Sequence, residues 1–239
     1  MRKSPVALIF FSLFFLFTTS VQASSFVTVT REGKTRQNVL GDSTSVGTMT
    51  VQSALSGARD LADATLSIIK EGEKSLLTVQ TPTSTKEQDV TKLTDSIVEI
   101  EQSQGSKTIK IGKIDDNFGI SQSGITALTS YPIHIDAASK TISVATNSGE
   151  RIIAVMPNDA LETLVRANIV NTISQDGQVV LGENENGELT YSIPAERNVN
   201  LFNVHTVAVQ VNTTVSATSG KVLKIDEPQW LKFFGFLFS

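Results

Sequence analysis

The sequence predicts an α+β fold that is rich in β-structure, and three observations support this. The first is a long strand pattern with a turn near its end, in residues 204–226. The second is a run of three short strand patterns in residues 132–156, and the third is an amphipathic helix pattern in residues 157–171. We therefore expect a C-terminal antiparallel sheet with three strands before the helix and four after it, one covering helix, and a smaller β-rich region preceding this sheet.

The strand pattern in residues 204–226 is the clearest in the chain. Val207, Val209 and Val211 alternate with polar or small residues, and a turn at residues 218–220 precedes the apolar positions of a second strand. This predicts a β-hairpin. The hairpin contains no cluster of acids, bases, nucleophiles or metal ligands, so it indicates architecture rather than chemistry.

The three strand patterns before the helix are separated by turn residues, which predicts an antiparallel meander. Asn158 is placed to cap the following helix, and Asp159 lies near the positive end of its dipole. The predicted apolar face contains Leu161, Leu164, Val165 and Ile169. Two further strand patterns follow, at residues 178–181 and 188–193.

Residues 1–23 have the pattern of a signal peptide. Arg2 and Lys3 precede an apolar run, and small residues at Val21 and Ala23 suit cleavage after Ala23. A transmembrane anchor is the alternative, but the run is shorter than the roughly 20 residues that a spanning helix needs. We expect an exported protein that is extracellular or associated with the cell envelope.

The composition excludes several classes of function. The net charge of −4 falls to −6 when Arg2 and Lys3 are removed, so nucleic acid is not an expected partner. The chain has no cysteine, which excludes thiol chemistry and zinc–cysteine sites. We expect no metal, no small-molecule cofactor and no catalytic residues.

The remaining segments suggest a division of the chain. We expect a flexible arm at 24–50, a small region with mixed α and β patterns at 51–114, a linker at 115–125 and an α+β module at 126–228. The pattern at 51–70 is helical, whereas 64–81 also fits two strands around a turn at 70–73. The secondary structure of residues 51–102 therefore stays open, with the hairpin favoured after Thr65.

The last third of the chain resembles the PepSY-type modules of exported bacterial proteins. The similarity lies in the helix, the strand pair with a polar turn, and a closing strand pattern at Val209, Val211, Val215, Ser216, Ala217, Gly220, Lys221 and Val222. Residues 132–239 also look similar to uncharacterised exported bacterial proteins. The PepSY resemblance implies a small α+β unit that binds or restrains peptidases, and neither resemblance implies a catalytic residue.

Three short patterns suggest chemistry, and each has a simpler interpretation. Gly41-Asp42-Ser43 resembles the nucleophile block of GDS-type esterases, but the partner motifs around His134 and His205 are absent, so a loop turn is favoured. The two histidines and Asp136 could ligate a metal if their strands were neighbours, but two ordinary strand histidines are favoured because no other residues at ligand spacing surround them. The acidic turn at 183–188 lacks the end positions of a calcium loop and is interpreted as a hairpin tip.

The aromatic tail at residues 229–239 is the feature that most strongly indicates a function. It is too short to span a membrane, but a helix there would place Trp230, Phe233, Phe234 and Leu237 on one face. This suits an interfacial anchor, a groove-binding segment or a plug on the domain's own core. The expected contact residues are Trp230, Leu231, Phe233, Phe234 and Leu237, and the expected partners are an envelope protein, a peptidase or a membrane surface.

Together these observations predict a non-enzymatic exported envelope or surface protein with a C-terminal binding module. Its tail would act as the contact or anchor. A PepSY-like module that restrains a peptidase is the alternative, and an esterase that uses Ser43 is a more distant one.

Overall fold

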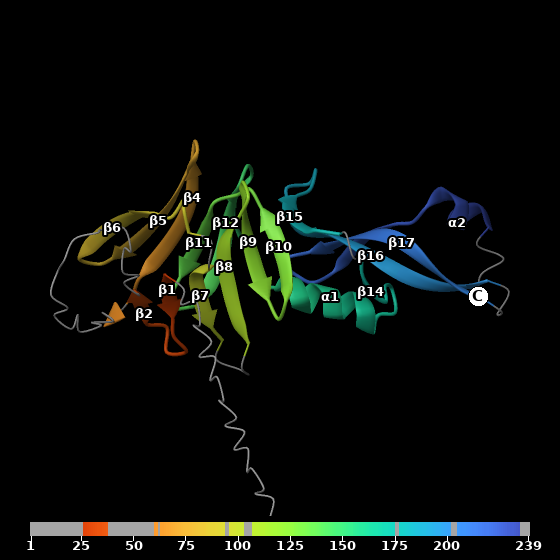
Figure 1. Ribbon diagram of the computed structural model, residues 1–239, viewed down its shortest axis with the longest axis horizontal. Helices are drawn as coiled ribbons and strands as arrows, with labels where there is room; N and C mark the ends of the chain where they lie inside the picture. Colours follow the sequence, from red (N-terminus) through yellow and green to blue (C-terminus); the bar gives the residue numbers. More distant parts are fainter. Residues whose placement is uncertain are drawn as a thin grey trace, which may run out of the picture.

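The computed structural model describes residues 26–37, 60–61, 63–93, 96–102, 107–174, 177–201 and 205–234. These residues form two β-sheets and two short helices (Figure 1). The signal-peptide segment 1–23, Ser43 and residues 51–59 lie outside the described residues. The predictions made for those segments therefore stay predictions.

The larger sheet contains twelve strands in the described part of the chain, eleven of them in one row. In spatial order these are β18 (Val222–Asp226), β17 (His205–Ser216), β16 (Leu189–Leu201), β15 (Val179–Glu183), β10 (Ile125–Thr129), β9 (Asn117–Gln122), β8 (Thr108–Ile114), β7 (Ser96–Glu101), β1 (Val27–Val29), β2 (Thr35–Gln37) and β3 (Asp60–Leu61). The short strand β14 (Thr172–Ile173) pairs with β16 outside this row. The sheet is mixed, because β1 is parallel to β7 and β10 is parallel to β15.

The smaller sheet has six strands, and all its neighbours are antiparallel. Its order is β13 (Gly149–Ile152), β12 (Thr141–Thr146), β11 (Ile133–Asp136), β4 (Thr65–Glu71), β5 (Lys74–Thr81) and β6 (Ser84–Asp89). The helices are α1 (Pro157–Arg166) and α2 (Gln229–Phe234).

The α+β prediction is wrong. The strand order along the chain resembles the expected one, but the strands do not form one C-terminal sheet under a helix. The meander β11–β13 pairs with β4 in the smaller sheet, whereas β15–β18 belong to the larger, mixed sheet. The fold is β-rich with two short helices, because strand pairs distant in the sequence outcompete the expected local sheet.

The linker expected at 115–125 is occupied by β9 and the turns on either side of it. β9 pairs with β8 and β10 in the middle of the larger sheet. The polar residues Asp115, Asp116 and Ser123 lie in the turns, where Asp115 and Ser123 adopt positive φ, whereas Asn117, Ser121 and Gln122 lie within β9. The structure therefore replaces a boundary between two units with a continuous sheet.

The N-terminal segments also join the sheets. Within the expected arm, β1 pairs with β7 and places Val27 and Val29 in the core. The hairpin favoured after Thr65 is confirmed, since β4 and β5 pair around the turn at Gly72, which has a φ of 60°. No helix is present in residues 60–61 or 63–70, which are the described part of the expected helix at 51–70.

Helix α1 is shorter than predicted and begins differently. Met156 occupies the N-cap position without a side-chain cap, and Pro157 begins the helix. Asn158 instead donates to Oε1 of Glu162 at 2.7 Å. The buried face is formed by Pro157, Ala160 and Leu164, and the exposed fraction of Val165 is 40%. The prediction of Asn158 as the cap and of Asn171 as the helix end is therefore wrong.

One contiguous hydrophobic core receives side chains from both sheets and from α1. Leu66, Ile68 and Ile133 come from the smaller sheet, and Ile111 and Ile120 come from the larger one. The two sheets are thus held by shared burial of apolar surface rather than by separate cores.

The β16–β17 hairpin extends well beyond this core. β17 pairs with β16 along its whole length, from Ser216 opposite Thr190 to His205 opposite Leu201. The neighbouring strands pair with only part of this hairpin. On β16, residues 189–192 pair with β15 and residues 195–196 pair with β14; on β17, residues 212–215 pair with β18. The far part is a two-stranded ribbon that projects at one end of the molecule (Figure 1). We call residues 197–201 and 205–209 the distal ribbon.

Candidate functional site

Helix α2 packs against the distal ribbon. Pro228 lacks an amide hydrogen and follows β18, and its carbonyl accepts a bond from the Leu231 amide at 3.0 Å. Leu231 is buried and forms a small apolar cluster with Val199 and Val209, which is separate from the main core. The helix therefore gives the ribbon a small core of its own.

An ion pair fixes the start of this arrangement. Nη1 of Arg197 lies 2.7 Å from Oε1 of Glu227, and both side chains are partly buried. Val209 lies opposite Arg197 in the strand register, so this ion pair is on the same face of the ribbon as the apolar cluster. The chain thus turns from β18 onto that face before α2 begins.

The same helix exposes large aromatic surface. The exposed fraction is 44% for Trp230 and 76% for Phe233, while Leu231 between them is 7% exposed. The expected contact residue Leu231 therefore packs inside the chain. The side chain of Phe234 and the whole of Leu237 lie outside the described residues. The tail therefore has a buried residue, Leu231, as expected for a plug, and two exposed aromatic residues. We call Trp230 and Phe233 the aromatic pair.

The two histidines are not brought together. His134 lies in β11 of the smaller sheet, opposite Ser67 and Ser143, whereas His205 begins β17 in the larger sheet. Asp136 accepts the amides of Ala138 and Ser139 and so shapes a turn. The hypothesis of a metal site formed by His134, His205 and Asp136 is therefore wrong. Within the described ranges, no group of three or more metal-ligating side chains is present.

The acidic turn at 183–188 is the tip between β15 and β16. Oδ1 of Asn184 accepts hydrogen bonds from the amides of Asn186 and Glu188, and these bonds organise the turn. Hydrogen bonds from Ser148 and then Thr146 lower the pKa of Glu183. This carboxylate therefore joins the turn to the hairpin of β12 and β13.

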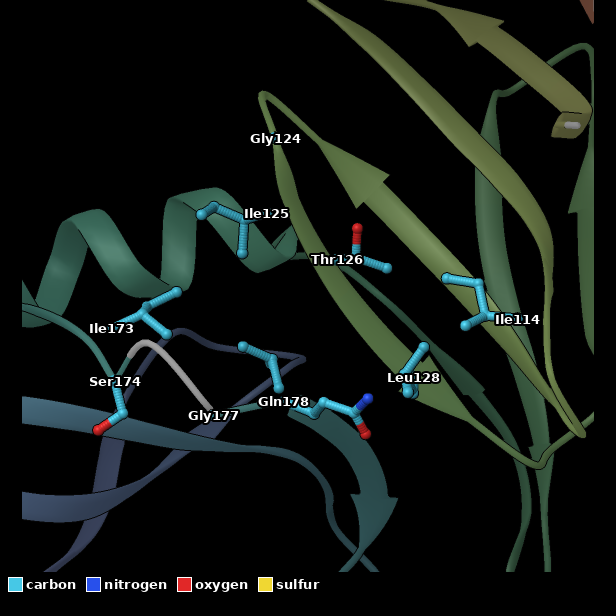
Figure 2. A pocket seen from close by; sticks show the side chains of 10 residues that line it. Ile114, Gly124, Ile125, Thr126, Leu128, Ile173, Ser174, Gly177 and Gln178 are labelled. Atoms are coloured by element: carbon cyan, nitrogen blue, oxygen red, sulfur yellow. The ribbon is translucent and has the colours of Figure 1, made fainter.

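An apolar groove of about 390 Å³ lies beside β10. Figure 2 shows Ile125 and Ile173 at one end of it and Ile114 and Leu128 at the other. Among the described residues, its lining contains no acidic, basic or imidazole group. Sequence reasoning missed this groove because β10 and β14 are neighbours only through the tertiary fold.

A second hollow, of about 540 Å³, is polar. Lys107 and Asp159 line it and pair with each other at 3.2 Å, and Lys140 donates to the carbonyl of Arg31. Oε1 of Gln122 is buried there and has no hydrogen-bond partner among the residues that the structure describes. The charged groups of this hollow are thus engaged within the protein.

Comparisons with known proteins return no match: no family model, no curated protein and no solved structure is similar to the chain. In the described part of the chain, neither helix has the length and apolar character required to cross a membrane. The candidate site is therefore defined by geometry alone, and it is the aromatic pair on α2.

Proposed function

We propose that this chain is a non-enzymatic exported protein of the cell envelope or cell surface, and that α2 attaches it to the interfacial region of a membrane. The observation that carries the proposal is the exposure of Trp230 and Phe233 on a helix held at the end of the distal ribbon. Trp and Phe are favoured at the boundary between lipid headgroups and acyl chains.

The packing of Leu231 supports insertion rather than collapse of the tail. With Leu231 buried against Val199 and Val209, the helix is held in place and cannot hide the aromatic pair without breaking that cluster. Burial of a large apolar side chain contributes about 1.5–3 kcal/mol. Two such side chains correspond to a Kd of roughly 1 mM, so a single helix is a weak and reversible anchor.

The charge of the protein defines the kind of membrane. Without Arg2 and Lys3 the net charge is −6, so the exported chain is repelled by anionic headgroups, and its attachment depends on apolar contact. We therefore expect binding to zwitterionic phosphatidylcholine vesicles, and weaker binding when an anionic lipid is added at low salt.

The chain carries its own reporter for this experiment, because Trp230 is its only tryptophan. Titration of residues 24–239 with phosphatidylcholine vesicles should shift the Trp230 emission to shorter wavelength. Phe233→Ser should weaken the binding about tenfold, since it removes one inserted side chain. Vesicle co-sedimentation measures the same change independently.

Ile152→Ser is the matched control, because Ile152 is 55% exposed but lies on β13, in the other sheet. It should leave the emission shift and the co-sedimentation unchanged. An unshifted Trp230 emission at millimolar lipid would refute the membrane proposal. In that case a protein partner for the aromatic pair, identified by crosslinking from Phe233, becomes the explanation to test.

A further inference from the structure

The outer edge of β17 is only partly covered. β18 pairs with Asn212 to Val215, and a bulge at Leu223 lies within that short pairing. On this edge, residues 205–211 of β17 have no strand partner in the part of the chain that the structure describes. The alternate residues Thr206, Ala208 and Gln210 are exposed. In a strand, the backbone N–H and C=O groups of alternate residues point to the same side. The amide of Ser216 bonds to the carbonyl of Lys221, on the side where β18 lies. Thr206, Ala208 and Gln210 are an even number of residues from Ser216, so their backbone groups also point outward on that side.

This segment lacks the features that protect a sheet edge. Unpaired strands usually carry charges or proline, which prevent pairing with another chain. The other edges have them: β6 carries Lys86, Glu87 and Asp89, β13 carries Glu150 and Arg151, and β18 carries Lys224 and Asp226. The twelve residues of β17 contain no Lys, Arg, Asp, Glu or Pro.

We propose that residues 205–211 of β17 pair antiparallel with the same residues of a second copy of this chain, around a two-fold axis at Ala208. Ala208 is the midpoint of the uncovered segment. Pairing centred there uses all of that segment and stops at Asn212, where β18 begins to occupy the edge. A register shifted either way would use fewer residues or collide with β18.

The side chains suit a copy of themselves. In this register Val207 of each chain lies opposite Val209 of the other, and Thr206 lies opposite Gln210, so no like charges meet. The outward groups of Thr206, Ala208 and Gln210 would form about six interchain hydrogen bonds. A neutral, valine-rich strand offers little to a charged partner, whereas self-pairing satisfies every one of these groups.

The pairing has a consequence for the aromatic pair. A two-fold axis perpendicular to an antiparallel sheet keeps each face on its own side, so the α2 helices of both chains would lie on one face. If α2 attaches to a membrane, the dimer inserts two helices together and binds much more tightly than one chain. The strand pairing itself stands on β17 and does not require the membrane proposal.

Cysteine crosslinking tests the register sharply, because the chain has no cysteine of its own. Ala208→Cys places two thiols opposite each other at the axis, within the Cα separation of about 5.5 Å that a disulfide needs. Under mild oxidation residues 24–239 with Ala208→Cys should form a covalent dimer. Gln210→Cys alone should not, but it should crosslink when mixed with the Thr206→Cys chain.

Sedimentation equilibrium measures the noncovalent dimer. Ala208→Lys places two ammonium groups together and should weaken dimerisation at least tenfold, whereas Ala208→Thr should not. The same measurements in a Phe233→Ser background exclude association through the tail, and the dimer should persist there while vesicle binding is weakened. A chain that stays monomeric at millimolar concentration, or a Gln210→Cys chain that self-crosslinks as readily as Ala208→Cys, overturns the proposal.

Discussion

Tyr191 shows how a single side chain joins the larger sheet to the segment between β13 and α1. It is fully buried in β16, and its hydroxyl donates to the carbonyl of Val155, just before α1, at 2.9 Å. Burial raises the pKa of Tyr191 far above its ordinary value. The phenol therefore keeps its proton, and with it the hydrogen bond, throughout the physiological range of pH.

Tyr191→Phe should lower the free energy of unfolding by about 1–3 kcal/mol, because the carbonyl of Val155 is left buried without a donor. Urea unfolding followed by circular dichroism measures the change. Tyr131→Phe, in a partly buried loop, is the control and should have a much smaller effect. Equal losses in the two variants would contradict the role of this hydrogen bond.

Alkaline pH tests the same residue. The unfolded chain releases the Tyr191 proton near the ordinary pKa of 10.0, whereas the folded chain retains it. When the pKa of the folded state lies above that of the unfolded state, the resulting stability is complete at pH values below the unfolded pKa. This stability declines as the pH rises above the unfolded pKa. Unfolding midpoints measured between pH 9 and 11 should therefore fall more steeply for the natural chain than for Tyr191→Phe.

At the scale of the element, α2 combines two roles that the sequence suggested as alternatives. Leu231 stabilises the distal ribbon, which as an isolated pair of strands would be only marginally stable in water. Trp230 and Phe233 leave their surface exposed. On this short helix Leu231 faces the ribbon, whereas Trp230 and Phe233 face the solvent. This explains why the same stretch of sequence fits both a plug and an anchor.

Leu231→Ala should destabilise the ribbon locally by about 2 kcal/mol, because it leaves a gap over Val199 and Val209. Amide hydrogen exchange should become faster at Val209 and its neighbours and stay unchanged at core positions such as Ile120. Phe233→Ser is the matched variant on the same helix, and it should leave ribbon exchange unaffected. Faster exchange throughout the sheet after Leu231→Ala would show that the cluster is not an independent unit.

At the scale of the whole molecule, the chain passes repeatedly between the two sheets. β10 is followed by β11 in the other sheet, and β13 is followed through α1 by β14 and β15 in the first. The residues 126–228, which the sequence suggested as a module, are therefore divided between sheets. Ile133 and Ile135 of β11 depend on their partners Ile68 and Leu66 of β4.

The fragment 126–228 should consequently fail to fold alone, because it lacks β4, β5 and the strands β7 to β9 that complete both sheets. Its amide proton spectrum should be poorly dispersed and its urea unfolding non-cooperative, in contrast to residues 24–239. A cooperative transition in the fragment would restore the independent module.

The sequence by itself determined the local elements of this protein. Period-two alternation identified β17 and the β4–β5 hairpin, and turn residues placed most strand ends, because these signals depend on side chains a few residues apart. The aromatic tail was also identified from the sequence alone. The tertiary structure decided which strands are neighbours, and so replaced one α+β layer with two sheets. It also decided that Leu231 is buried while Phe233 is exposed, and that residues 205–211 of β17 have no strand partner on their outer edge within the described part of the chain. Those outcomes depend on contacts between distant segments, which alternation along one strand does not encode.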